Sequence, residues 1–110
     1  MSRLMLAFMA SSMICGPALG QDPKAQRGRG LLQAHCAQCH AIGRLEASPL
    51  GIAPPFRELH KRYPVEDLAE SLAEGIVTGH PTMPEFRFDP AQIGDVIAYL
   101  KTLERQPQPR

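Results

Sequence analysis

The sequence predicts an all-α domain with about three main helices. Apolar residues recur at spacings of three and four along three stretches, whereas no segment shows the sustained two-residue alternation of a half-buried strand. The dipeptide Asp-Pro occurs twice, at residues 22–23 and 89–90. Aspartate is a favourable N-cap and proline is tolerated in the first helical turn, so we expect a helix to begin at each site.

Residues 1–20 are expected to be a signal peptide that is cleaved after Gly20. A short positive region ending at Arg3 precedes an apolar run, and Ala18 and Gly20 are the small residues that a signal peptidase recognises. The run is shorter than the about 20 residues that a membrane-spanning helix needs. The residue before Cys15 is isoleucine rather than the small residue of a lipoprotein signal, which argues against acylation. The sequence therefore predicts export to the periplasm.

The expected mature domain, residues 21–110, is formally neutral. Loss of Arg3 would reduce the 12 basic residues to 11, which equals the 11 acidic residues. This balance argues against a nucleic-acid-binding protein. The domain has no tryptophan and few other aromatic residues, so a chain this short would bury little apolar area without a cofactor. From about residue 105 we expect a frayed tail.

The first helix is predicted over residues 23–35. Its inner face should carry four residues at helical spacing: Gly28, Leu31, Leu32 and His35. Glycine costs a helix up to roughly 1 kcal/mol relative to alanine. Gly28 and Gly30 therefore predict that another backbone or a ring lies close to the helix at these positions.

Residues 41–55 are expected to form an irregular loop, because two glycines and three prolines interrupt any helical periodicity there. A loop of roughly 15 residues is long for a compact domain unless it wraps another group. A short helical turn is expected at residues 56–59.

A second helix is expected over residues 65–74, and Gly75 would end it. Its apolar stripe has helical spacing and consists of Val65, Leu68, Leu72 and Ile76. The other face carries Glu66, Glu70 and Glu74, and is either a solvated surface or an acidic docking stripe for a basic partner.

Residues 79–88 are expected to be irregular, with a proline on each side of Met83. The last helix should begin at Pro90, because Asp89 and Gln92 form a variant of the capping box. Its predicted apolar face consists of Ile93, Val96, Ile97, Leu100 and Leu103.

The pentapeptide CAQCH at residues 36–40 is the strongest functional motif. Two cysteines three positions apart can add to the two vinyl groups of haem, and a histidine directly after them can bind the iron from one face. We therefore predict one haem c per chain, attached covalently through Cys36 and Cys39, with His40 as the proximal axial ligand. In an oxidising compartment, a free pair of this kind would otherwise close into a disulfide.

Met83 is the predicted distal axial ligand, because every other methionine lies within the expected signal peptide. A thioether between prolines, in a loop rather than on a helical stripe, fits a ligand better than a core residue. Histidine with methionine is an established axial pair that raises the reduction potential. His80 is an alternative ligand, and His35 and His60 are further candidates with less support.

Two other roles for the cysteine pair fit less well. A zinc site needs four spread tetrahedral ligands, but Cys39 and His40 are adjacent and there is no second CxxC or HxxxH pair. A thioredoxin-like redox site would place the pair between a strand and a helix, and no strand is predicted.

This order of motifs resembles a class I cytochrome c of the small monohaem bacterial type over residues 23–104. The resemblance rests on CAQCH, on Thr-Met-Pro around Met83, and on a last helix that contains Tyr99 followed by leucine. It implies the small cytochrome c fold, in which helices and loops pack around the haem. The tryptophan that the family places near the haem propionates is missing, which leaves Arg44 or Arg57 as open candidates for those contacts.

The resemblance also implies three contacts. Gly28 would lie where the first helix crosses the last, near Val96. Leu32 would lie near Tyr99 at the same crossing. The carbonyl of Pro54 would accept a hydrogen bond from the proximal histidine, which orients the ring and makes it a stronger donor to iron.

We therefore expect a one-electron carrier and not an enzyme, with both axial positions filled by His40 and Met83. Oxygen or peroxide could bind the iron only by displacing Met83. Redox proteins would dock transiently at the haem edge of a monomer that has no nucleic-acid partner and no stable membrane insertion after cleavage. The alternatives are a haem subunit of a larger dehydrogenase or oxidase, or a peroxidase-like or ligand-sensing haem protein if Met83 is loosely held.

Overall fold

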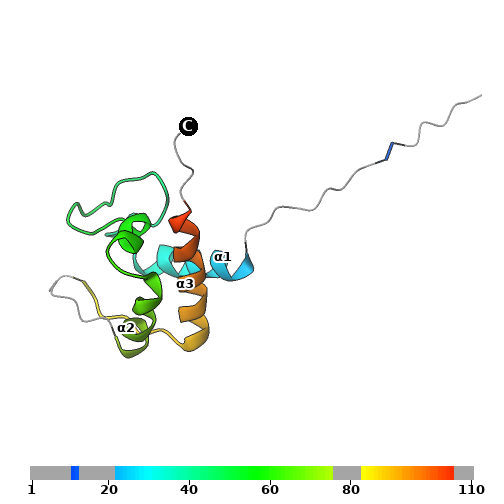
Figure 1. The fold of residues 1–110 in the computed structure, drawn as a ribbon. Helices are drawn as coiled ribbons and strands as arrows, with labels where there is room; N and C mark the ends of the chain where they lie inside the picture. Colours follow the sequence, from blue (N-terminus) through cyan, green and yellow to red (C-terminus); the bar gives the residue numbers. More distant parts are fainter. Residues whose placement is uncertain (1–10, 13–21, 76–82, 106–110) are drawn as a thin grey trace, which may run out of the picture.

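A computed structural model of the chain describes residues 11–12, 22–75 and 83–105. It contains α1 (Pro23–His35), η1 (Phe56–Lys61), η2 (Val65–Asp67), α2 (Leu68–Glu74) and α3 (Pro90–Glu104), where η marks a 3₁₀ helix (Figure 1). The described residues form no strand, and the predicted all-α fold with three main helices is confirmed. In the same ranges, no helix has the length and apolar character needed to cross a membrane. Most of the predicted signal peptide, His80 and the tail after residue 105 lie outside the described residues.

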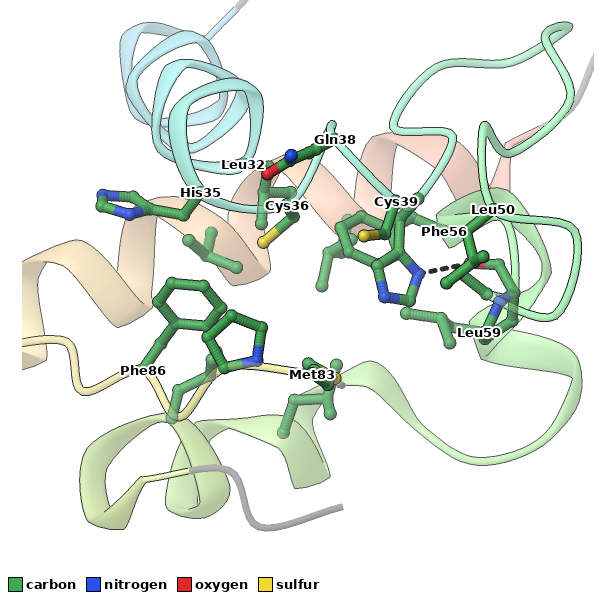
Figure 2. A pocket seen from close by; sticks show the side chains of 18 of the residues that line it. Leu32, His35, Cys36, Gln38, Cys39, Leu50, Phe56, Leu59, Met83 and Phe86 are labelled. Atoms are coloured by element: carbon green, nitrogen blue, oxygen red, sulfur yellow. Dashed lines mark hydrogen bonds between the residues drawn. The ribbon is translucent and has the colours of Figure 1, made fainter. Parts of the chain in front are cut away.

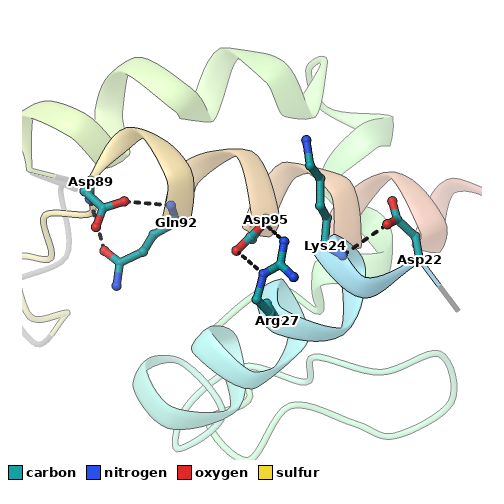
Figure 3. Close-up of polar contacts among 6 residues, drawn as sticks. All are labelled: Asp22, Lys24, Arg27, Asp89, Gln92 and Asp95. Atoms are coloured by element: carbon teal, nitrogen blue, oxygen red, sulfur yellow. Dashed lines mark hydrogen bonds and ion pairs between the residues drawn. The ribbon is translucent and has the colours of Figure 1, made fainter.

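Both Asp-Pro signals start helices, as predicted. Asp22 accepts a hydrogen bond from the backbone N–H of Lys24 at 3.1 Å, and α1 covers the predicted residues 23–35. At the start of α3, Asp89 accepts from the N–H of Gln92 at 2.8 Å, and the Gln92 side chain accepts from the N–H of Asp89 at 3.1 Å (Figure 3). These reciprocal bonds satisfy two of the N–H groups that a helix start leaves free.

The middle helix is shorter than predicted. Residues 65–67 form the 3₁₀ helix η2, and α2 begins only at Leu68. Pro64 has an extended backbone, with φ −60° and ψ 132°. Its carbonyl accepts an i→i+3 hydrogen bond, typical of a 3₁₀ helix, from the N–H of Asp67 at 3.1 Å. Gly75 ends α2 as predicted, with a positive φ of 103° that a residue with a side chain rarely adopts.

Helices α1 and α3 cross at Gly28. Figure 3 shows the neighbouring contact between Arg27 of α1 and Asp95 of α3. A Cβ atom on Gly28 would lie 1.9 Å from the carbonyl oxygen of Asp95 and 2.9 Å from the nitrogen of Val96. Arg27 also reaches Asp95 with two hydrogen bonds, at 3.0 and 3.2 Å. The predicted close approach is confirmed at Gly28 but is wrong at Gly30, where a Cβ would meet nothing within 4 Å.

The core lies between these helices and the loops around them. Val65, Val96 and Leu103 are fully buried, and α3 also buries Ile93, Tyr99 and Leu100. Four predicted core-facing positions differ, since Leu31, Leu68 and Ile97 are half-buried and His35 is exposed. His35 sits in the last turn of α1, where the helix meets the motif rather than the core.

The side chains of Arg44 and Tyr99 tie the loop after the motif to α3. The Arg44 guanidinium donates to the carbonyls of Thr102, at 2.7 Å, and Arg105, at 3.1 Å, which are carbonyls that a helix end leaves free. The buried Tyr99 hydroxyl donates to the carbonyl of Ile42 at 2.5 Å. Arg44 therefore caps a helix, a role different from the propionate contact considered for it.

Candidate functional site

A cavity of about 330 Å³ lies between α1, the loop after it, η1, α2, α3 and residues 83–88. Both motif cysteines, His40 and Met83 line it, and the other lining residues are mostly apolar. Figure 2 shows Cys36 and Cys39 along one wall and Met83 on the facing one. No lysine, arginine, aspartate or glutamate of the described residues lines the cavity. The fold thus brings together the four residues predicted to hold a haem.

The cysteine pair lies in a turn that continues directly from α1. The N–H of Cys36 bonds to the carbonyl of Leu32 at 2.8 Å, and the N–H of His40 bonds to the carbonyl of Cys36 at 3.0 Å. Cys36 and Cys39 are free and half-buried. Burial, and secondarily the neighbouring Cys39, raises the pKa of the Cys36 thiol to about 11. Burial therefore disfavours the thiolate form of Cys36.

The His40 ring is held from two sides. Its Nδ1 lies 2.8 Å from the carbonyl oxygen of Pro54, the bond that is dashed in Figure 2. With Nδ1–H as the donor, Nε2 carries the free lone pair and is the nitrogen able to bind a metal. The ring of Phe56 packs against the imidazole, with a centroid separation of 4.7 Å and a tilt of 33°. Phe56 was not predicted at the site, although it follows the proline pair directly.

The loop that carries Pro54 is closed by its own hydrogen bonds. The N–H of Ala41 donates to the Ser48 hydroxyl at 3.0 Å, and the N–H of Phe56 donates to the carbonyl of Ala41 at 2.9 Å. These bonds fix both ends of the loop beside His40. Nothing in the sequence pattern marks Ser48 for this role, since serine is common in any loop. Arg57, the other propionate candidate, donates to the carbonyl of Glu46 at 2.6 Å.

The other wall is formed by residues 83–88 and α2. Met83 is half-buried in an irregular segment, as the prolines predicted, and Leu68 and Leu72 of α2 line the same wall. His35 also lines the cavity, whereas His60 lines a separate surface depression with basic neighbours.

The residues present fit a covalently attached haem. Two thiols, an imidazole and a thioether share one mostly apolar cavity, which matches a flat apolar cofactor with two reactive vinyl groups and two axial positions. A zinc site is not supported, because the described residues contain no group of three or more His, Cys, Asp or Glu side chains that could hold a metal ion by themselves.

Comparisons with known proteins agree with this fit. The family model described as Cytochrome c matches residues 25–104. A cytochrome c-553-like protein of Synechocystis sp. is 30% identical over 103 residues, which cover 90% of this chain and 88% of that protein. A cytochrome c-552 of Bradyrhizobium diazoefficiens is 32% identical over 100 residues, which cover 91% of this chain and 89% of that protein. No solved structure gives a significant match.

Proposed function

The chain belongs to the cytochrome c family, whose members carry covalently attached haem c, and we propose that it is an exported one-electron carrier. One observation carries the proposal: Cys36, Cys39, His40 and Met83 line one apolar cavity. The names of the two relatives, both cytochromes c, agree with electron transfer rather than with an enzyme.

In this proposal each residue has a separate task. Cys36 and Cys39 would form the two thioether bonds to the haem, and His40 and Met83 would bind its iron. Pro54 orients the imidazole by accepting its Nδ1–H across 2.8 Å, and Phe56 limits rotation of the same ring. When bound, the haem supplies a one-electron couple at its iron, which a thioether ligand shifts to higher potential.

The surrounding residues give the cavity a polarity that suits a one-electron couple. Apolar side chains from α1, η1, α2 and α3 make up most of its lining, so its effective dielectric constant is lower than that of water. The imidazole and the thioether are both neutral, so neither brings a buried charge. No carboxylate of the described residues lines the cavity, and the proposed role of the protein is to hold, orient and bury the cofactor.

The proposal also covers the cellular location of the protein. Residues 1–20 would direct export and be removed after Gly20, leaving residues 21–110 as a monomeric periplasmic domain. Redox proteins would bind transiently at the haem edge, through the small interface typical of electron-transfer encounters.

Mass spectrometry of the secreted protein, together with its optical spectrum, tests the proposal. The expected mass is that of a chain beginning at Gln21 plus one haem. The ferric protein should show the weak far-red band of methionine-ligated haem, and Met83→Ala should abolish it. His80→Ala and His60→Ala serve as matched controls and should keep the band. A wild-type protein without the band, or a band that survives Met83→Ala, would show that the ligand assignment is wrong.

A further inference from the structure

His35 joins the two sides of the cavity through its ring. It is the last residue of α1, next to Cys36, and its imidazole packs edge-on against two phenylalanines of residues 83–88. The ring centroids are 5.6 Å from Phe86, at 65°, and 5.5 Å from Phe88, at 70°. The two phenyl rings are parallel to each other, 6.5 Å apart. Figure 2 shows His35 above the ring of Phe86 at one end of the cavity.

Among the described residues, residues 83–88 are attached to the rest of the fold mainly through Phe88, which is buried in the core, and Phe86, which packs against it. They form no helix or strand, and their backbone bond to another described element runs from the N–H of Phe88 to the carbonyl of Leu72, at 2.9 Å. The ion pair of Glu85 and Arg87 is exposed and lies within the segment itself. The core holds Phe88, and the edge-on contacts with His35 add a link between this segment and the end of α1.

We propose that His35 is a positioning residue for Met83. The inference rests on the proposed function, in which Cys36 anchors one side of the haem and Met83 binds the iron from the other. The His35 ring holds the segment that carries Met83 against the helix end that carries Cys36. Loss of the ring should let the segment move away and release Met83 more often. The contact is made by ring edges and faces, so a phenyl ring at residue 35 should serve as well.

The test measures how easily added imidazole displaces Met83. The full exported, haem-loaded protein is titrated with imidazole in its ferric state and the far-red band is followed. His35→Ala should raise the apparent imidazole affinity about fivefold, because two edge-on contacts of an exposed ring are lost. His35→Phe should restore the wild-type affinity. His60→Ala is the matched control and should leave the affinity unchanged, since His60 lies outside the cavity.

A double-mutant cycle identifies the partner of the ring. Phe86→Ala should also raise imidazole affinity. In the double variant the increase should be smaller than the product of the two single fold-changes, because the shared contact is lost only once. Urea unfolding of each variant, followed by helical circular dichroism, separates local release of Met83 from global destabilisation. A loss of global stability alone would leave the affinity of the folded protein for imidazole unchanged.

The outcomes separate this proposal from the one on which it rests. If the wild-type protein lacks the far-red band, both proposals fail. If the band is present and Met83-dependent, but His35→Ala leaves imidazole affinity unchanged, only the role of His35 is wrong. The same conclusion follows if His35→Phe behaves like His35→Ala, or if the effects of His35→Ala and Phe86→Ala are fully independent.

Discussion

Replacement of Gly28 by alanine should separate the two helices that enclose the cavity. The new Cβ would meet backbone atoms of α3, and the gap to the Asp95 oxygen would have to widen from 1.9 Å to at least 3.0 Å. Overpacking of this kind costs about 1–3 kcal/mol, and the upper end applies because the obstacle is backbone rather than a flexible side chain. The higher helix propensity of alanine returns about 1 kcal/mol. The expected net loss is about 2 kcal/mol.

Urea and thermal unfolding of the haem-loaded protein measure this loss. For a domain of this size, about 2 kcal/mol corresponds to a decrease of roughly 10 °C in Tm. Gly30→Ala is the matched control, because it lies in the same helix but its Cβ would meet nothing within 4 Å. It should stabilise the protein by up to about 1 kcal/mol. A Gly28→Ala protein as stable as wild type, or a Gly30→Ala protein destabilised equally, would refute the assigned crossing.

Three further substitutions test other contacts. Tyr99→Phe should cost about 1–2 kcal/mol in urea unfolding, because the buried carbonyl of Ile42 loses its hydroxyl donor, and an unchanged midpoint would contradict this. Asp89→Ala should cost about 1 kcal/mol through loss of the α3 cap, and Asp89→Ser should recover most of it. The backbone N–H of Glu46 and, with a smaller effect, that of Gly43 donate hydrogen bonds to the Glu46 carboxyl and lower its pKa. Its stabilising effect is therefore complete above the unfolded pKa of about 4.3 and is lost as the pH falls through the lower folded value. Wild type should lose stability relative to Glu46→Gln between about pH 5 and pH 3, and a difference independent of pH would count against this.

Helix ends were predictable because their signals are local. An aspartate followed by proline satisfies a free N–H group within one turn, whatever the rest of the chain does, and both α1 and α3 begin where this signal stands. The 3₁₀ turn at residues 65–67 was missed, because apolar spacing over so few residues does not distinguish it from the first turn of an α-helix.

The two glycines of α1 show why propensity alone misleads. Gly28 and Gly30 have the same low helix propensity, but they are two residues apart and so face opposite sides of the helix. Only Gly28 shares a face with Leu32, and only Gly28 contacts α3. The predicted inner face already contained Gly28 and not Gly30, so helical position distinguishes two glycines that propensity does not.

The site was predictable where neighbours in sequence act together. The spacing of CAQCH places Cys36, Cys39 and His40 at one cavity because the turn after α1 is short. The contacts of His35 with Phe86 and of Arg44 with α3 join residues far apart in the chain. No local pattern specifies such pairs, since they depend on how the whole chain closes.

The closing of the chain by α3 has a consequence for how the molecule is assembled. The motif that binds the cofactor is complete within five residues. The helix crossing that supports it requires Gly28 of α1 and Asp95 of α3, which are far apart in the chain. Attachment and burial are therefore separable events. A fragment that ends before Pro90 would keep every atom needed for the two thioether bonds. It would lack α3, the helix against which α1 packs. The attached haem would then lie on a chain without a cooperative fold.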